Sequence, residues 1–232
     1  MSQRFKYGRT YHFDWSLSLI NDDRRLPEDQ LEILKGEEIV VTEKFDGENT
    51  SMYHDISHAR SMDSRHHVSR DWAKKFHGEI KHLIPEDWRI VIENCYAKHS
   101  IFYSREQGNP LPSYAMGLSI WDREGALDWD ETLMVFDDLG IIPARTLYRG
   151  DFDIDVLKKI AAEQDPQLVE GYVVRTTKRI SYGKWFLPAA KYVRAQHVTS
   201  GHHWMTAEVV PNELMTNEQL AEVAQLIKEG RW

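Results

Sequence analysis

The sequence predicts a single α+β domain with antiparallel sheets, peripheral helices and a short helical C-terminal tail. Apolar strand-like runs alternate with helical patterns along the 232 residues, and no linker, low-complexity tract or internal repeat separates two cores. A hydrophobic content of 41% suffices to bury one substantial core. We expect the domain to span residues 1–204 and the tail to span residues 205–232.

Short apolar runs and helical patterns place the individual elements. Strands are predicted at 39–42, 50–53, 89–93, 114–121 and 171–176, and helices at 71–84, 130–139, 153–163 and 217–229. Prolines fall in loops between these elements, as their fixed φ and missing N–H group require. In the last helix, an apolar face indicates packing against a core and is formed by Leu220, Val223, Ala224 and Ile227.

The charge of the chain restricts its contacts with nucleic acid. A formal charge of −8 disfavours a protein that coats nucleic acid nonspecifically, because phosphate contacts require clustered cations. Two local stretches are nevertheless rich in cations, and together they predict a basic channel, although each member alone is equally compatible with a solvated face. These residues are Arg60, Arg65, Arg70, Lys74 and Lys75, followed by Arg175, Lys178, Arg179, Lys184, Lys191 and Arg194.

Composition also indicates the compartment. No apolar run approaches the roughly 20 residues that cross a bilayer, and the N-terminus lacks the apolar segment of a signal peptide. We therefore expect a cytoplasmic protein without membrane contact. The single cysteine, Cys95, excludes an intramolecular disulfide and disfavours a cysteine zinc site. Its position in a predicted strand favours a buried, apolar role.

The most informative segment is residues 41–49, which read VTEKFDGEN. Lys44 ends an apolar strand, and a lysine amine attacks phosphorus only when it is uncharged, so we expect it to be desolvated or close to other cations. Asp46 is suited to a divalent cation or its waters, and Gly47 permits close approach of the backbone to a nucleotide. Asn49 offers a paired donor and acceptor. The alternative is an ordinary strand that ends in an Asp-Gly turn.

Four later segments make the pattern more specific. They read VIEN at 91–94, SIWD at 119–122, EGYVVR at 170–175 and AKYVR at 190–194. Together with the lysine segment they resemble the ligase and capping-enzyme superfamily of covalent nucleotidyltransferases, and specifically its RNA ligase 2-like branch, whose lysine motif reads Lys-x-Asp/His-Gly-x-Asn. The resemblance spans most of the chain. It implies the antiparallel-sheet nucleotidyltransferase fold, which is similar to that of ATP-grasp ligases.

The resemblance implies a role for each segment. Lys44 is expected to attack the α-phosphorus of ATP and to form lysyl-AMP, with Lys191 near the same phosphate. Asp46 and Glu170 are expected to bind or support a magnesium or manganese ion. The implied catalytic residues are thus Lys44, Asp46, Glu170 and Lys191. The implied nucleotide-binding residues are Glu43, Lys44, Asn49, Arg60, Glu93, Trp121, Lys191 and Arg194.

The positions of two implied phosphate contacts stay open. Arg60 is preferred, but Arg65 and Arg70 follow at close spacing, and a short motif does not fix the register among them. In the last segment, Val193 stands where many relatives carry a second lysine. Arg194 supplies a charge one residue later, yet side chains alternate between the faces of a strand, so this replacement is not automatic.

Two other assignments compete with ordinary structural roles. Glu93 is implied in binding a ribose hydroxyl, and the alternative is a strand-end acid that pairs with a cation. Trp121 is implied in stacking on adenine, and the alternative is a core tryptophan beside an apolar strand.

The implied activity is ATP-dependent sealing of RNA 5'-phosphate and 3'-hydroxyl ends in RNA repair, with nicked duplexes as the preferred substrate. A partner protein that heals ends or binds RNA is also expected. About forty residues follow Lys191, so we expect no separate OB domain, which disfavours the alternatives of a DNA ligase or a GTP-dependent capping enzyme. A non-catalytic nucleotide-binding or RNA-binding module is the remaining alternative.

Overall fold

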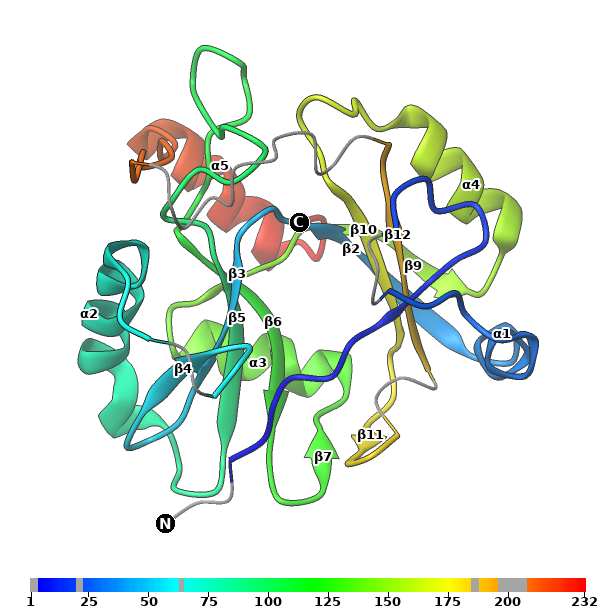
Figure 1. The fold of residues 1–232 in the computed structure, drawn as a ribbon, viewed down its shortest axis with the longest axis horizontal. Coiled ribbons are helices and arrows are strands. Elements are labelled where there is room, and N and C mark those ends of the chain that lie inside the picture. The colour runs from blue at the N-terminus through cyan, green and yellow to red at the C-terminus, as the bar shows by residue number, and fades with distance from the viewer. Residues whose placement is uncertain (1–3, 20–22, 63–64, 185–187, 196–207) are drawn as a thin grey trace.

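The computed structural model describes residues 4–19, 23–62, 65–184, 188–195 and 208–232, which form two sheets surrounded by helices (Figure 1). In these residues the first sheet has the strand order β1-β12-β10-β2-β9. Its neighbouring strands are antiparallel except for the parallel pair β1 and β12. The strands are β1 (Tyr11–His12), β12 (Ala189–Val193), β10 (Gly171–Thr176), β2 (Glu38–Lys44) and β9 (Thr146–Asp151).

The second sheet has the strand order β11-β7-β6-β5-β3-β4, and β8 pairs with β6 outside this path. Its neighbouring strands are antiparallel except for the parallel pair β6 and β8. The strands are β11 (Ile180–Ser181), β7 (Gly125–Ala126), β6 (Ala115–Trp121), β5 (Arg89–Asn94), β3 (Glu48–Met52), β4 (Ser57–Ala59) and β8 (Ile142–Pro143).

Helices pack against each sheet and create two main cores (Figure 1). The first sheet packs against α1 (Glu28–Lys35) and α4 (Ile154–Glu163), which contribute buried Leu34 and Leu157. The second sheet packs against α2 (Asp71–Ile80) and α3 (Trp129–Asp138), which contribute Ile80 and Phe136. Among the described residues, no helix is long and apolar enough to cross a membrane.

The alternation of side chains along β2 explains how one strand serves both a core and a site. Ile39 and Val41 point into the core beneath α1 and α4. The period of two in a strand therefore directs Thr42 and Lys44 to the opposite face. Strand β3 of the second sheet begins at Glu48, so the three residues 45–47 connect the two sheets at this point.

The predicted strands and helices are present, with ends that differ by up to a few residues. The largest difference is at α2, which ends at Ile80 because Lys81–Leu83 form a 3-10 turn before Pro85. The predicted ranges omit helix α1, strand β9 and the shorter strands β1, β4, β7, β8, β11 and β12. Helix α1 has only eight residues, and the sequence of β9 shows no clean alternation because its residues are half-buried or exposed.

The C-terminal helix α5 (Asn217–Lys228) packs on the domain and begins with a capping box at Thr216. Val223, on the predicted apolar face, is buried, and the indole N–H of Trp232 donates to the carbonyl of Pro143 at 2.9 Å. The predicted apolar face therefore packs only in part, because Leu220 and Ile227 are half-buried and Ala224 is exposed. The predicted boundary between residues 204 and 205 lies outside the described residues.

Candidate active site

A cavity of about 360 Å³ lies between the two sheets and contains the predicted lysine segment. This volume lies within the usual range for small-molecule sites. The first sheet and the segment before β1 contribute Tyr7, Gly8, Arg9, Thr10, Thr42, Glu43, Lys44, Val173, Arg175 and Lys191. The other lining residues come from the connecting residues 45–47 and from the second sheet with its helices and loops. They are Phe45, Gly47, Glu48, Asn49, Arg60, Glu93, His99, Leu118 and Trp129.

Strand register explains why distant motifs meet at this cavity. In the first sheet, Thr42 pairs with Val173, which in turn pairs with Lys191. Directly opposed residues share a face, so all three line the same wall. Lys44, two residues after Thr42, lies on that face and is opposite Gly171. In the second sheet, Asn49 pairs with Glu93 in the same way.

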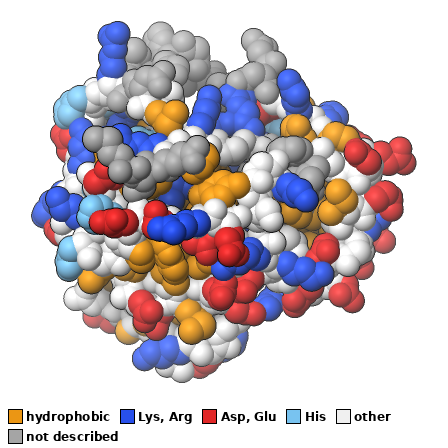
Figure 2. Space-filling model, turned by 90° about the horizontal axis from the view of Figure 1, so that it is seen from below, with side chains coloured by type: hydrophobic (Ala, Val, Ile, Leu, Met, Phe, Trp, Pro, Cys, Tyr) orange, Lys and Arg blue, Asp and Glu red, His pale blue; other side chains and the backbone are white. Residues whose placement is uncertain are grey.

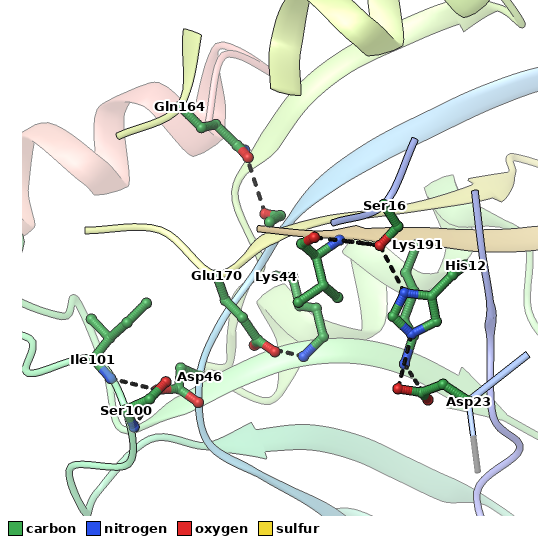
Figure 3. A network of polar contacts seen from close by, with 12 residues as sticks. His12, Ser16, Asp23, Lys44, Asp46, Ser100, Ile101, Gln164, Glu170 and Lys191 are labelled. Atoms are coloured by element: carbon green, nitrogen blue, oxygen red, sulfur yellow. Dashed lines mark hydrogen bonds and ion pairs between the residues drawn. The ribbon is translucent and has the colours of Figure 1, made fainter. Parts of the chain in front are cut away.

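The Lys44 ammonium donates a hydrogen bond to Glu170 Oε2 at 2.6 Å (Figure 3). Burial alone would lower the pKa of Lys44, but the charges of Glu170, Glu93 and Asp46 outweigh it, and the pKa is raised. The expected desolvation of Lys44 is thus present, but in the protein without nucleotide the neighbouring carboxylates outweigh it and favour the charged amine. Lys44 rests as a cation and has to lose a proton before it can act as a nucleophile.

Glu93 lines the cavity at the end of β5 and belongs to the same charge cluster. Burial, together with the smaller effects of Glu170, Asp46 and Glu48, raises the pKa of its carboxyl group to about 8 against the attraction of Lys44. A carboxyl with this pKa is both a hydrogen-bond donor and an acceptor near neutral pH. The predicted contact with a ribose hydroxyl is compatible with either form.

Asp46 has different contacts from those expected of a metal ligand. Its Oδ2 accepts hydrogen bonds from the backbone N–H groups of Ser100 and Ile101, at 2.7 and 2.6 Å, and from the Ser100 hydroxyl at 2.8 Å (Figure 3). Asp46 and Glu170 are both absent from the residues that line the cavity, but Glu170 reaches the wall through its hydrogen bond to Lys44. Asp46 thus anchors the loop that carries His99 to the cavity wall. His99 was not predicted as a site residue, although the sequence places it beside Ser100.

The two predicted metal-binding carboxylates do not form a ready-made cage. In the described part of the chain, no group of three or more His, Cys, Asp or Glu residues is arranged to hold a metal ion. Glu170 is buried and bonded to Lys44, whereas Asp46 is bonded to the loop at Ser100. Any bound magnesium ion would therefore rely on waters and substrate phosphates for much of its coordination.

Two glycines allow the backbone to pack closely around these residues. A Cβ atom at Gly47 would lie 2.6 Å from the backbone oxygen of Asn94, and one at Gly171 would lie 2.0 Å from that of Tyr192. Gly171 also has a φ of +151°, which side chains rarely adopt. Gly47 therefore fixes the chain three positions after Lys44, and Gly171 fixes it directly after Glu170.

Lys191 lies on the same wall and contacts Asp23 Oδ1 at 3.3 Å (Figure 3). Burial, followed by the charge of Lys44, lowers the pKa of Lys191, and Asp23 opposes both effects. The other oxygen of Asp23 lies 3.2 Å from Nε2 of buried His12. Neither Asp23 nor His12 was predicted, because nothing in the sequence relates them to a lysine about 170 positions away.

The structure distinguishes among the three candidate arginines. Arg60 lines the cavity, as preferred. Arg70 donates through Nε to Glu48 Oε2 at 2.6 Å and through Nη1 to the backbone oxygen of Arg65. Arg65 is exposed and is not part of the cavity wall. The geometry thus places Arg60, and not Arg65 or Arg70, within reach of a ligand.

Asn49 and Glu43 also border the cavity, with different side-chain contacts. The Oδ1 atom of Asn49 is buried and accepts no hydrogen bond within the described residues. A ligand donor would satisfy this atom. The Glu43 carboxylate accepts from Arg145 at 2.8 Å, and burial raises its pKa.

Two predicted nucleotide contacts are not brought to the cavity wall. Trp121 is buried, its indole N–H donates to Ser119 Oγ at 2.9 Å, and the Arg89 guanidinium lies 4.5 Å from its ring centre. Trp121 therefore follows the alternative of core packing, and buried Trp129 borders the cavity instead. Arg194 is likewise absent from the lining, as expected if a one-residue shift changes the face of β12.

Several cations of the expected basic channel are buried or paired with acidic side chains. Arg175 is buried and donates to the backbone oxygen of Leu127, Lys178 pairs with Glu37 at 2.8 Å, and Arg179 pairs with Asp122 at 2.7 Å. On the face seen in Figure 2, lysine and arginine side chains alternate with acidic ones. The second cation-rich stretch therefore does not form a continuous basic surface.

Comparison with known proteins identifies the fold and the family. A putative ATP-dependent DNA ligase from Aquifex aeolicus is similar in structure, with a TM-score of 0.53 and 17% identity over 82% of this chain and 50% of that chain. An archaeal ATP-dependent RNA ligase, form 2, has a TM-score of 0.51 and 14% identity over 81% and 48%. This chain thus spans about half the length of both proteins, and no curated protein sequence matches it. The family model for RNA ligases matches residues 37–193, more than half of the chain, and the protein belongs to the RNA ligase family.

Proposed function

We propose that this protein is an ATP-dependent RNA ligase that acts through lysyl-AMP on Lys44. The observation that carries the proposal is the hydrogen bond of 2.6 Å between Lys44 and Glu170 at a nucleotide-sized cavity. The membership in the RNA ligase family supports the same reaction. Lys191, on the same wall as Lys44, supplies a cation for the α-phosphate.

In the proposed first step, the Lys44 nitrogen uses its lone pair to form a bond to the α-phosphorus of ATP. The bond from that phosphorus to the bridging oxygen breaks, and pyrophosphate leaves with its electron pair. The protons released from the nitrogen pass to Glu170 and then to solvent. Glu170 is suited to this role because it already accepts a hydrogen bond from the ammonium group.

The charge around Lys44 suits a divalent cation bound together with ATP. Glu170 places negative charge beside Lys44, and Glu93, whose pKa is raised mainly by burial, lies in the same cluster. Glu170 is the residue beside Lys44 that would support magnesium or manganese. Such an ion would offset the charge of the triphosphate. Asp46 would contribute indirectly, by holding the loop at Ser100.

The cavity wall also suggests how ATP would be oriented. We assign Arg60 and Lys191 to the phosphates, Glu93 to a ribose hydroxyl, and the vacant acceptor of Asn49 to a donor on the nucleotide. Glu43 borders the same cavity as a further polar group. The apolar side chains of Leu118, Val173 and Trp129 form the part of the lining suited to the base.

The proposed substrate is RNA with a 5'-phosphate and a 3'-hydroxyl end. AMP would pass from Lys44 to the 5'-phosphate, and the 3'-hydroxyl would then attack this activated phosphate and release AMP. We propose nicked duplex RNA as the preferred form and RNA repair in the cytoplasm as the setting. A partner that heals the ends or binds RNA would complement a catalytic domain at 1–204 with a short tail at 205–232.

Strand sealing tests this function directly. Nicked duplexes with RNA strands at the nick are incubated with magnesium and ATP, next to duplexes with DNA strands, single-stranded RNA ends and reactions with GTP. We expect ATP-dependent joining of RNA ends, and no joining by Lys44→Met. Lys159→Met is the matched control, because Lys159 is exposed on α4. Preferential sealing of DNA would indicate a DNA ligase, and transfer of GMP would indicate a GTP-dependent capping enzyme. Sealing by Lys44→Met would contradict the mechanism through lysyl-AMP on Lys44.

A further inference from the structure

Lys191 is held in place before any nucleotide arrives. Its ammonium lies 3.3 Å from Asp23 Oδ1, and only 15% of its side chain and 10% of that of Asp23 are exposed. A lysine side chain has four rotatable carbon bonds and loses considerable entropy when fixed. The charge-assisted contact with Asp23 already fixes the Lys191 side chain in the free enzyme. The entropy of fixing this side chain is therefore not lost again when a phosphate binds.

Asp23 is itself fixed by a chain of polar groups that starts on the strand of Lys191. The backbone N–H of Val193 donates to Ser16 Oγ at 2.9 Å, and Ser16 Oγ lies 2.7 Å from His12 Nδ1. The Ser16 hydroxyl also lies 3.4 Å from the carbonyl of Val193, as a second acceptor beside His12 Nδ1. If it donates to Nδ1, Nε2 of His12 carries the proton, and Nε2 lies 3.2 Å from Asp23 Oδ2 in a close polar contact rather than a well-aligned hydrogen bond.

The backbone next to Asp23 is also anchored to β1. The N–H of His12 donates to the carbonyl of Arg24 at 2.8 Å, and the N–H of Leu26 donates to the carbonyl of His12 at 2.7 Å. Burial lowers the pKa of His12 to about 4, so His12 is neutral at physiological pH and does not compete with Lys191 as a cation. Asp23 therefore occupies a fixed position, and its Oδ1 atom lies 3.3 Å from the Lys191 ammonium and 3.8 Å from Nη1 of Arg9.

We propose that Asp23 is a positioning residue of the nucleotidyl transfer, which holds the Lys191 ammonium on the cavity wall through a carboxylate fixed by His12 and Ser16. This inference rests on the proposed function of Lys191 at the α-phosphate. In the opposite role, Asp23 would compete with the nucleotide phosphate for Lys191. The Asp23 carboxylate would then have to move away from Lys191 when ATP binds. The anchored backbone at Arg24 and Leu26 favours the positioning role.

The test is the single-turnover rate of lysyl-AMP formation, measured against ATP concentration for Asp23→Asn. This variant keeps the size of the side chain and removes its charge. We expect the rate at saturating ATP to fall between about ten- and a hundredfold, as for misplacement of a catalytic group. Asp14→Asn is the matched control, because Asp14 is 79% exposed in the same segment of the chain, and we expect it to keep the parent rate.

A double-mutant cycle separates positioning from a general structural effect. If Asp23 acts through Lys191, adding Asp23→Asn to Lys191→Ala leaves the rate of the Lys191→Ala single variant nearly unchanged. Multiplicative losses would overturn the inference, as would a normal rate or tighter ATP saturation in Asp23→Asn alone. An unchanged rate in Lys191→Ala would overturn the inference together with the proposed role of Lys191, so the two failures are distinguishable.

Thermal unfolding of each variant shows whether it is folded at the assay temperature. Asp23→Glu is the second variant, because it keeps the carboxylate one carbon further from the backbone. We expect it to recover part of the rate lost in Asp23→Asn. A rate in Asp23→Glu as low as in Asp23→Asn would mean that the charge does not matter, and would overturn the positioning role.

Discussion

Lys44 Nζ and Glu170 Oε2 lie 2.6 Å apart, in a contact between a residue at the end of β2 and a residue just before β10. The contact holds the attacking nitrogen in its charged form, because Glu170, Glu93 and Asp46 together raise the pKa of Lys44 above its ordinary value. The same carboxylate is placed to accept a proton once a nucleotide changes the charge balance. In the proposed mechanism, activation of Lys44 would therefore be coupled to ATP binding.

Replacement of this acceptor has a specific expected effect. Glu170→Gln keeps the shape of the side chain but removes its charge and its ability to take a proton. We expect the rate of lysyl-AMP formation to fall about a hundredfold or more, the usual contribution of a positioned acid or base. The measurement is adduct formation after rapid mixing with ATP. Glu163→Gln on the exposed surface of α4 is the control, and a comparable rate in both variants would contradict the proton-acceptor role.

The rate of adenylylation should rise with pH. The raised pKa of Lys44 means that the neutral amine is a small fraction near pH 7 and increases about tenfold with each pH unit. Rates of lysyl-AMP formation measured at saturating ATP between pH 6 and 9 test this expectation. A rate that stays constant across this range would show that deprotonation of Lys44 does not limit the step.

Stability should depend on pH through Glu93. Its pKa is about 8 in the folded protein and near 4.5 in a free side chain, so the protonated form is favoured by folding. This contribution to stability is fully present below pH 4.5 and is lost as the pH rises through 8. We expect Glu93→Gln to be more stable, relative to the parent, at pH 9 than at pH 5. Thermal unfolding of both proteins at the two pH values checks the difference, and an equal shift at both would contradict the raised pKa.

The close approach at Gly171 predicts a large cost for a single methyl group. In Gly171→Ala, the new Cβ would meet the carbonyl oxygen of Tyr192 at a φ that alanine rarely adopts. We expect a loss in the free energy of unfolding of more than about 1 kcal/mol, measured by denaturant titration. Gly78→Ala is the control with the opposite sign, because Gly78 lies in α2 with open space around it and should gain up to about 1 kcal/mol.

Asp46 provides a test of loop anchoring against direct metal binding. In Asp46→Ala the N–H groups of Ser100 and Ile101 lose their acceptor. We expect faster hydrogen exchange at these two amides and a lower rate of adenylylation that excess magnesium does not restore. Recovery of the rate at high magnesium, with unchanged exchange at Ser100 and Ile101, would instead support a direct metal contact.

The sequence was most informative where strand periodicity and motif order act together. The lysine at the end of β2 and the second lysine in β12 were both identified, and register explains why they share a wall. Arg60 was preferred over Arg70, and the structure agrees, because Arg70 is bonded to Glu48. These features depend on local pattern and on pairing between strands that the motifs themselves define.

Contacts that depend on tertiary packing were not predictable. The partners of Asp46 come from a loop more than fifty residues away, and Asp23 reaches Lys191 only because its segment is anchored to β1. Motif order placed Trp121 at the base-binding site, but packing against Arg89 places it in the core. A pattern of residue types identifies a strand, but the neighbours of each side chain follow from how the elements pack.

The most direct test of the central proposal is the mass-spectrometric mapping of an adduct formed by the purified protein with magnesium and ATP, with GTP and NAD in parallel. Intact mass before incubation establishes whether the protein already carries AMP. We expect ATP to add one AMP to Lys44 and Lys44→Met to acquire none. AMP attached to another residue, or no adduct from any nucleotide with initially unmodified protein, would contradict catalysis through lysyl-AMP at Lys44.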